Sequence, residues 1–400
     1  MNDVYLFDAV RTGRGRSKPG GALAHRTPLE LLDTVLTGLT ERNGLPADAV
    51  DDLVLGVATQ TGAQGGNLAR TAAILAGWTR TPGMTVNRFC ASGIDAINTA
   101  AAHTLAGTAG LIVAGGVESV SRTPMYADHA PLFEDPDVVE RAGSVAMGIA
   151  ADLIATLEGF DRTELDAYGA RSQQRASAAW QAGRFAADVR AVIGPDGEPF
   201  AADEAVRAGT TAEALAQLPP AFAKLGANGQ DDLVRRHHPE VGEVRHLHTV
   251  GTSPTLVDAA AVTLIGTAEA GRAHGLRPRA RVVSVASAAV DPVVMLTGGQ
   301  TAVEHALGRA GLRPEDIAVF EIAEAFAATC LKFQRDLKID DARLNPNGGT
   351  LAMGHAFAAT GPILAANCLG ELERRGERFG VIAVSGAAGL GSATVLERIA

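Results

Sequence analysis

An internal repeat constrains the fold of this 400-residue chain more than any other feature of its sequence. Residues 44–50 read Gly-Leu-Pro-Ala-Asp-Ala-Val, and a similar Gly-Leu-Arg-Pro-Glu-Asp-Ile occupies residues 311–317, an offset of 267 residues. The apolar run at 111–115 has a counterpart at 381–385, an offset of 270 residues. Because strand-like and helix-like stretches alternate in both copies, the repeat predicts a duplicated α/β unit whose sheets are covered by helices on both faces.

Each copy carries one potentially reactive side chain at an equivalent position. Cys90 lies between the strand-like residues 84–86 and a helical, alanine-rich stretch at 94–102, and His355 lies 265 residues further along, ahead of its own helical stretch. Two helix ends that face each other can bring both side chains to one site. Free N–H groups and the positive end of a helix lower a thiol's pKa from its usual value of about 8.5, so the junction predicts an activated Cys90. The alternative interpretations are a buried structural cysteine and a structural histidine.

Two motifs around these side chains resemble those of the thiolase family. Residues 87–93 read Asn-Arg-Phe-Cys-Ala-Ser-Gly, like the family's nucleophile segment Asn-x-x-Cys-x-Ser-Gly, and His355 follows Asn-Pro-Asn-Gly-Gly and Gly354 within residues 345–355. The order and separation of the motifs also match, and the resemblance covers nearly the whole chain. It implies a layered αβαβα fold built from two duplicated halves with an inserted loop domain.

The chemistry of these two side chains agrees with what the resemblance implies. A thiolate attacks thioesters readily, and a neutral imidazole is the natural base to generate it near neutral pH. The resemblance implies that Cys90 is acylated, that His355 activates it, and that the backbone N–H groups of Cys90 and Ala387 bind the oxyanion. It further implies contacts to the substrate or to CoA from Met147, Ser253, Phe326 and Gly386. A core methionine is the alternative interpretation of Met147, and the stretch after Ser253 departs from the family in having Ala259 in place of glycine.

The repeat and the different character of the stretch between its copies predict the domain plan. The N-terminal half spans 1–120 and is completed by 250–270, the inserted loop domain spans 121–249, and the C-terminal half spans 271–400. The insertion contains a long helical stretch at 162–183, for which Thr163 is the expected cap. In thiolases the corresponding insertion shapes the CoA and acyl pockets.

Two functional positions of the family are altered in this chain. Thiolases have an Asn-Glu-Ala-Phe-Ala segment whose asparagine holds a water in one oxyanion hole, whereas this chain has Ala323 there. Losing one oxyanion donor costs on the order of 10²-fold to 10³-fold in turnover. Ser385 stands where the family has a cysteine that shuttles a proton, and a hydroxyl is a poorer acid or base near neutrality. Cys330 and Cys368 lie within helical patterns and are expected to be buried.

These features predict an acyltransferase of the thiolase type, which forms a Cys90 acyl-enzyme from a 3-oxoacyl-CoA or acyl-CoA and passes the acyl group to CoA or to an acyl-CoA carbanion. The residues around His355 are most similar to those of degradative thiolases, including the trifunctional-enzyme β type. This similarity favours a role in fatty acid degradation. One alternative is an acyltransferase or hydrolase that retains acylation and has lost the Claisen step. Another is a non-catalytic subunit that binds CoA esters.

Composition excludes several other classes. The 46% hydrophobic and 20% charged content indicates a soluble globular chain, and the net charge of −10 argues against nucleic-acid binding. No transmembrane span, secretory signal or peroxisomal address is visible, so a cytoplasmic location is expected. No cofactor is expected, since CoA is substrate and product. The resemblance implies a homodimer or homotetramer, and a β-oxidation partner subunit is a further candidate.

A histidine-rich run at 235–248 raises the question of a metal site. It contains His237, His238, His246 and His248, but their spacing matches no known ligand pattern. We therefore expect a solvated loop and no metal, with the alternative that the basic residues Arg235 and Arg236 meet CoA phosphates.

Overall fold

The computed structural model describes residues 3–399. Its first half builds one side of the molecule with strands in the spatial order β1-β9-β5-β3-β4. The strands β1, β9 and β5 are antiparallel neighbours, and β5, β3 and β4 are parallel. The elements are β1 (Tyr5–Thr12), β2 (Gly15–Arg16), α1 (Pro28–Asn43), β3 (Asp52–Gly56), α2 (Leu68–Leu75), β4 (Gly83–Val86), α3 (Ser92–Ala106), β5 (Leu111–Glu118) and, after the insertion, β9 (Val257–Gly266).

The second half repeats this plan with the order β10-β13-β12-β11. Neighbouring strands are again antiparallel, antiparallel and parallel, and a parallel bridge from Phe320 to Leu344 takes the place that β4 has in the first half. The duplication predicted from the sequence is confirmed. The elements are α11 (Ala268–Ala273), β10 (Ala280–Ala289), α12 (Gly298–Ala310), β11 (Val319–Ile322), α13 (Ala327–Asp336), α14 (Thr350–Met353), α15 (Thr360–Arg375), β12 (Phe379–Ser385) and β13 (Leu390–Arg398).

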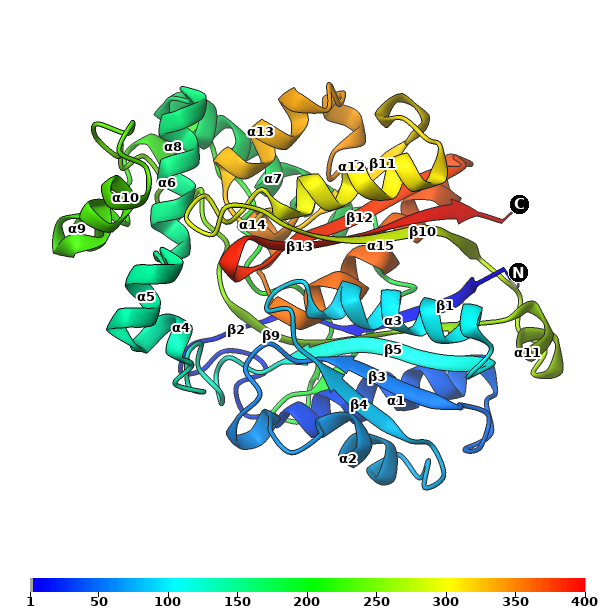
Figure 1. Cartoon of the computed structure of the whole chain (residues 1–400). Helices are drawn as coiled ribbons and strands as arrows, with labels where there is room; N and C mark the ends of the chain where they lie inside the picture. Colours follow the sequence, from blue (N-terminus) through cyan, green and yellow to red (C-terminus); the bar gives the residue numbers. More distant parts are fainter. Residues whose placement is uncertain (1–2, 400) are drawn as a thin grey trace.

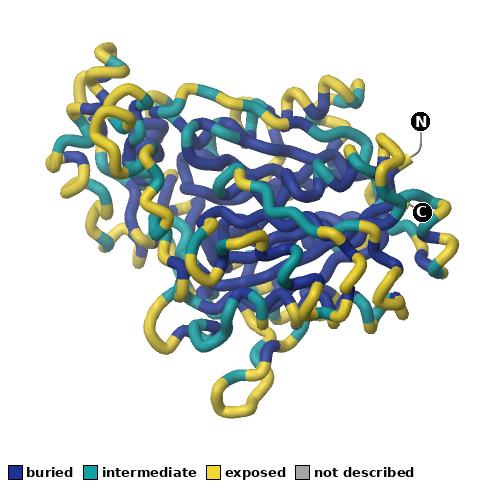
Figure 2. The backbone as a smooth tube through the Cα atoms, turned by 60° about the horizontal axis from the view of Figure 1, so that its bottom comes forward, coloured by how far each residue is buried: buried dark blue, intermediate teal, exposed yellow. Residues whose placement is uncertain are grey.

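Five layers result, as Figure 1 shows. Helices α1 and α2 cover the outer face of the first half, and α12 covers the outer face of the second. Helices α3 and α15 lie between the two sets of strands and pack against both, so the layered αβαβα arrangement is confirmed. Strands β5 and β9 are buried at every position, whereas most positions of β10 are partly exposed, and exposed backbone is concentrated at the periphery (Figure 2).

Two glycines let the central helices α3 and α15 approach each other closely. A Cβ atom on Gly93 would lie 2.0 Å from the Ala358 carbonyl oxygen, and one on Gly361 would lie 2.5 Å from the Ile94 nitrogen. Real Cβ atoms do not approach backbone atoms so closely, hence both positions require glycine. This contact brings the N-terminal ends of α3 and α15, one from each half, side by side.

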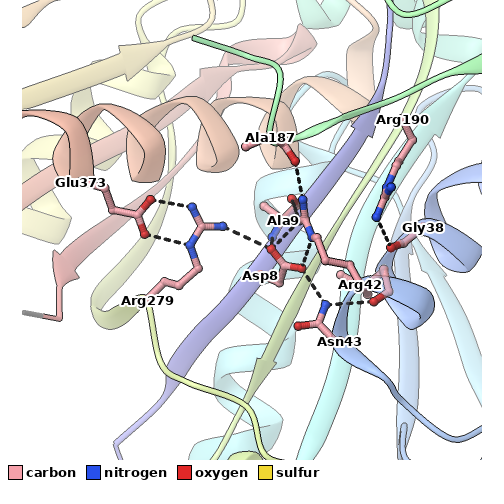
Figure 3. Close-up of polar contacts among 10 residues, drawn as sticks. Asp8, Ala9, Gly38, Arg42, Asn43, Ala187, Arg190, Arg279 and Glu373 are labelled. Atoms are coloured by element: carbon pink, nitrogen blue, oxygen red, sulfur yellow. Dashed lines mark hydrogen bonds and ion pairs between the residues drawn. The ribbon is translucent and has the colours of Figure 1, made fainter. Parts of the chain in front are cut away.

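A buried carboxylate also ties the two halves together. Asp8 on β1 accepts hydrogen bonds from Arg42 and Asn43 at the end of α1, with 2.7 Å from Arg42 Nε and 2.6 Å from Asn43 Nδ2. Arg279, which leads into β10, donates to Asp8 over 3.2 Å and to Glu373 of α15 over 2.7 Å. Figure 3 shows this network, in which first-half and second-half cations share one carboxylate.

Most helices of the insertion gather at one end of the layers (Figure 1), whereas its residues 189–190 pair with β1. Its long helix begins after Asp161, whose side chain accepts from Glu164 N while Glu164 accepts from Asp161 N. The expectation of Thr163 as the cap was wrong, because this reciprocal capping box leaves Thr163 inside the first turn. The elements are α4 (Pro131–Glu134), α5 (Pro136–Ala142), α6 (Met147–Glu158), α7 (Arg162–Gln181), β6 (Val189–Arg190), β7 (Val192–Ile193), β8 (Pro199–Phe200), α8 (Ala212–Ala216), α9 (Ala223–Leu225) and α10 (Asp231–His237).

Among residues 3–399, no helix is both long and apolar enough to span a membrane.

Candidate active site

Cys90 lies in a tight loop between β4 and α3, as the sequence predicts. Phe89 adopts a left-handed conformation with φ of +49°, and the Asn87 side chain accepts its N–H over 2.9 Å. The Ser92 hydroxyl closes the loop by donating to the Phe89 carbonyl over 2.6 Å and accepting from Arg88 N over 2.8 Å. The loop therefore fixes the backbone of Cys90, and its thiol is buried at the wall of a cavity.

His355 is held by its backbone and by one ring nitrogen. Its N–H donates to the Thr255 carbonyl over 2.8 Å, and its carbonyl accepts from Val257 N over 3.3 Å. Nδ1 is hydrogen-bonded to the Thr360 hydroxyl at 2.8 Å. When Nδ1 carries the proton and donates to Thr360, Nε2 presents the lone pair that a general base needs.

One cavity of about 410 Å³ collects most of the side chains that the sequence analysis selected. Cys90 comes from the first half, His355 from the second, and the insertion contributes to the wall. The other selected residues on this wall are Met147, Ser253, Phe326, Ser385 and Gly386. Ala387 lines a smaller adjoining pocket of about 30 Å³ together with Cys90 and Met147.

Most of the remaining wall is apolar. It comprises Met125, Tyr126, Ala146, Gly148, Phe222, Leu225, Pro254, Leu256, Leu296, Ala325 and Phe357. Across the described residues, none of the side chains lining this cavity is Lys, Arg, Asp or Glu. Such a wall accommodates an apolar acyl group, but it offers no ion-pair partner to a charged group at the far end of an acyl chain.

The pKa of Cys90 differs from the sequence expectation, whereas His355 is a neutral imidazole near pH 7 as expected. Burial, reinforced by the Glu118 carboxylate, raises the pKa of the Cys90 thiol to about 12. The expected depression of this pKa was wrong, because removing the sulfur from water outweighs the favourable backbone N–H groups. Burial, assisted by the Arg14 guanidinium, lowers the pKa of His355 to about 4. Near pH 7 the resting pair is therefore a neutral thiol and a neutral imidazole, and thiolate forms only as the base takes the proton.

Ser385 and Ala323 change the chemistry available beside this pair. The Ser385 hydroxyl donates to the Leu296 carbonyl over 2.7 Å and accepts from Gly299 N over 2.9 Å. Its single proton is thus engaged with backbone. Ala323 is buried and provides no polar side-chain atom.

The sequence analysis missed Glu118 and Thr360. Glu118 ends β5 and accepts from Ala58 N over 3.1 Å, from Gln64 Nε2 over 2.6 Å and from Ala358 N over 3.4 Å. It thereby joins the first half to the turn that follows His355, and burial raises its pKa to about 7. A carboxylate two residues after Gly116, at the end of an apolar strand, was the available signal.

The histidine-rich run is not a solvated loop throughout, which corrects the sequence expectation. His248 is fully buried, with Nδ1 hydrogen-bonded to Asp152 at 2.8 Å and Nε2 accepting from Ala328 N over 3.3 Å. His246 bridges Asp152 and Asp231. Within residues 3–399 no group of three or more His, Cys, Asp or Glu side chains is arranged to hold a metal ion. Cys330 and Cys368 are buried, as predicted.

Comparison with known proteins gives consistent matches along the chain. Family models described as the thiolase N-terminal domain and the thiolase C-terminal domain match residues 4–229 and 276–398. A 3-ketoacyl-CoA thiolase of Klebsiella pneumoniae is 38% identical, with 100% of both chains covered. A steroid 3-ketoacyl-CoA thiolase of Mycobacterium tuberculosis is 36% identical over 100% of this chain and 95% of its own.

Two further comparisons extend this set. A beta-ketoadipyl-CoA thiolase of Pseudomonas knackmussii is 38% identical over 99% of both chains. Among solved structures, an acetyl-CoA acetyltransferase of Bacillus anthracis superposes with a TM-score of 0.86 at 31% identity, covering 100% of this chain and 99% of that one.

Proposed function

The chain belongs to the thiolase family and is a thiolase-type acyltransferase, and from this premise we propose that Cys90 and His355 carry the reaction on an apolar 3-oxoacyl-CoA. The observation that carries the proposal is the single cavity lined by both side chains, one from each half. Thr360 holds the ring of His355, and Glu118 holds the turn that follows His355.

The reaction begins with attack of the Cys90 sulfur on the 3-oxo carbon while His355 Nε2 accepts the thiol proton. The N–H groups of Cys90 and Ala387 stabilise the resulting oxyanion. Collapse of this intermediate breaks the bond between C2 and C3 and expels the enolate of acetyl-CoA. The imidazolium holds the proton that this carbanion requires, and the shortened acyl group remains on Cys90. The thiol of CoA then attacks the acyl-enzyme, and its proton returns through His355 to restore the Cys90 thiol.

The substrate class follows from the cavity wall. A linear or ring-containing apolar acyl group would bury apolar surface worth about 25 cal/mol per Å². The second carboxylate of an adipyl-type acyl group would lose its hydration without a cationic partner. We therefore expect kcat/KM for an apolar 3-oxoacyl-CoA to exceed that for 3-oxoadipyl-CoA by at least about 10²-fold. Equal values would contradict this assignment of the cavity.

Intact-mass measurement after mixing with acyl-CoA and 3-oxoacyl-CoA esters tests the function directly. The expected product is one acyl adduct, lost in Cys90→Ser and formed more slowly in His355→Asn. An adduct that forms from acyl-CoA esters alone, with no cleavage of 3-oxoacyl-CoA, would favour an acyltransferase or hydrolase without Claisen chemistry. The occupied hydroxyl of Ser385 favours that second candidate. Absence of any adduct at every chain length would favour a non-catalytic CoA-ester-binding subunit.

We also propose assembly into a homodimer or homotetramer in the cytoplasm, with CoA as substrate and product and no separate cofactor. Strand β4 is an edge strand of the sheet, and its four residues are partly exposed. Ile74 and Leu75 of the adjacent α2 are exposed apolar side chains. Light scattering of the purified chain distinguishes these states from a monomer, and co-purification tests for a β-oxidation partner subunit.

A further inference from the structure

A buried cluster of two arginines and one aspartate lies behind the loop that carries His355. Arg14 belongs to the connection between β1 and β2, and its Nε donates to Asp203 Oδ1 over 3.2 Å. Arg11 donates to both oxygens of the same carboxylate, over 2.9 and 3.2 Å. All three side chains are almost completely buried. Because two guanidinium groups share one carboxylate, the cluster holds one positive charge that water does not screen.

Arg14 reaches from this cluster to the residues directly before His355. Its Nη1 donates to the Gly354 carbonyl over 3.1 Å, and its Nη2 lies 3.6 Å from the Met353 sulfur. Gly354 has a φ of +96°, and a Cβ atom there would lie 2.3 Å from Val257. The peptide that Arg14 contacts is therefore already in a conformation that few residues other than glycine adopt. Small rotations of this peptide would move the imidazole directly.

We propose that Arg14 is a positioning residue for the acyl-transfer reaction, which fixes the backbone carrying His355 and places an unscreened positive charge behind the imidazole. The role rests on the proposed function, because it matters only if His355 accepts the Cys90 proton. An imidazolium is disfavoured beside a buried cation, so the ring stays in its basic form. The same field makes the protonated ring a stronger acid toward the leaving enolate.

The other ionisable groups around His355 do not cancel this charge. Cys90 lies across the cavity with a pKa raised to about 12 by burial, so it is neutral in the resting enzyme. Glu118 of β5 approaches from the Ala358 side, and burial raises its pKa to about 7, so it is protonated over the pH range in which His355 titrates. Asp188, which interacts with Arg11, has its pKa raised to about 6 by burial and is also mostly protonated over that range. Glu321 of β11, which interacts with Arg14, is fully buried, and burial raises its pKa well above the ordinary range, which favours its uncharged form. Burial together with Arg14 lowers the pKa of His355 to about 4.

The test measures the rate at which uncharged iodoacetamide alkylates Cys90, as a function of pH, by intact mass. The acid limb of this profile reports protonation of His355 in the free enzyme. In Arg14→Met the imidazolium becomes easier to form, so the limb moves to higher pH by about one unit. In Arg14→Lys the positive charge remains, but a lysine cannot contact Asp203 and the Gly354 carbonyl at the same time as the guanidinium does. The acid limb therefore stays in place, and the plateau rate of alkylation falls about tenfold.

Trp180→Phe is the matched control. The Trp180 indole donates to Asp203 Oδ2 over 3.2 Å, so this variant weakens the same cluster without changing its charge or touching Gly354. Its acid limb is expected at the wild-type position. An unmoved limb in Arg14→Met, or an equal shift in Trp180→Phe, would overturn the proposal. If Arg14→Met does not fold, the lysine variant decides, since an upward shift of its limb refutes a role for the charge.

The alkylation readout is independent of CoA esters. An acid limb that moves as expected, in a protein that forms no acyl adduct, would refute the proposed function and leave the coupling between Arg14 and His355 established. An acyl adduct combined with an unmoved limb in Arg14→Met would refute the positioning role alone.

Discussion

Replacing Gly361 by alanine disturbs the contact between α3 and α15 on which the common cavity depends. The new Cβ would lie 2.5 Å from the Ile94 nitrogen and 2.8 Å from the Gly93 carbonyl carbon. Both are backbone atoms, so no side-chain rotation can relieve the overlap. To reach an ordinary contact of about 3.4 Å, the helices must separate by roughly 0.9 Å at this point.

The separation has a structural and a catalytic cost. Overpacking of this kind destabilises a fold by about 1–3 kcal/mol. With an unfolding entropy of about 2.1 cal/mol/K per residue over 400 residues, Tm falls by about 1–4 °C. The ends of the two helices carry Cys90 and His355, and a displacement of about 1 Å between reacting groups costs on the order of 10²-fold in rate. We therefore expect a small loss of Tm and a much larger loss of acylation rate.

The assay compares the rate of Cys90 acylation with the thermal midpoint in wild type, Gly361→Ala and Gly370→Ala. Gly370 lies in the same helix, but the nearest atom to its added Cβ would be Asp188 Oδ2 at 3.9 Å. That variant is expected to retain the wild-type rate and to gain up to about 1 kcal/mol from helix propensity. An acylation rate in Gly361→Ala within threefold of wild type would refute the claim that helix spacing sets the site geometry.

Three further predictions concern single side chains around the cavity. Ser385→Cys is expected to raise the rate of 3-oxoacyl-CoA cleavage at least about tenfold, because a thiol is a much stronger acid than a hydroxyl in the same surroundings. An unchanged rate would show that this position does not limit turnover. Thr360→Val removes the partner of His355 Nδ1 and should slow Cys90 alkylation about tenfold at pH 7 with Tm unchanged, whereas the wild-type rate would show that Thr360 does not select the tautomer. Glu118 binds its proton more tightly in the folded chain, where its pKa is about 7, than at its ordinary value of 4.5, so its contribution to stability falls as pH rises through this window. The stability of wild type relative to Glu118→Gln, measured by denaturant titration, should therefore decrease by about 3 kcal/mol from pH 4.5 to pH 7.5, and a constant difference would contradict the raised pKa.

Much of the fold follows from the sequence because the repeat is encoded locally. Residues 44–50 and 311–317 each form the connection from a helix to a strand. The strands that follow, β3 and β11, take corresponding places in the sheet. Helix caps are local as well, since the Thr27 side chain that begins α1 accepts from Glu30 N only three residues further along the chain. At α7 the reciprocal contact between Asp161 and Glu164 sets the start of the helix, and Thr163, which was expected there, lies inside the first turn.

The sequence identified the main residues of the candidate site, but it did not predict their pKa values. Cys90 and His355 stand out by their motifs, but the pKa of a thiol depends on burial and on Glu118, which approaches through the fold. The contact between Arg14 and Asp203 spans 189 residues, and that between Arg14 and Gly354 spans 340. No local pattern records such pairings, because each arises only when the insertion and both halves are assembled.

Because the reactive pair is divided between the two halves, activity requires that both halves are assembled. A cut in the exposed turn at Gly275, between β9 and β10, would separate a fragment bearing the sulfur from one bearing the imidazole. Neither fragment alone would possess a nucleophile with its base. Enzymatic turnover regained on mixing the fragments would thus measure the fraction of reassembled molecules, in which the α3–α15 contact joins the two fragments.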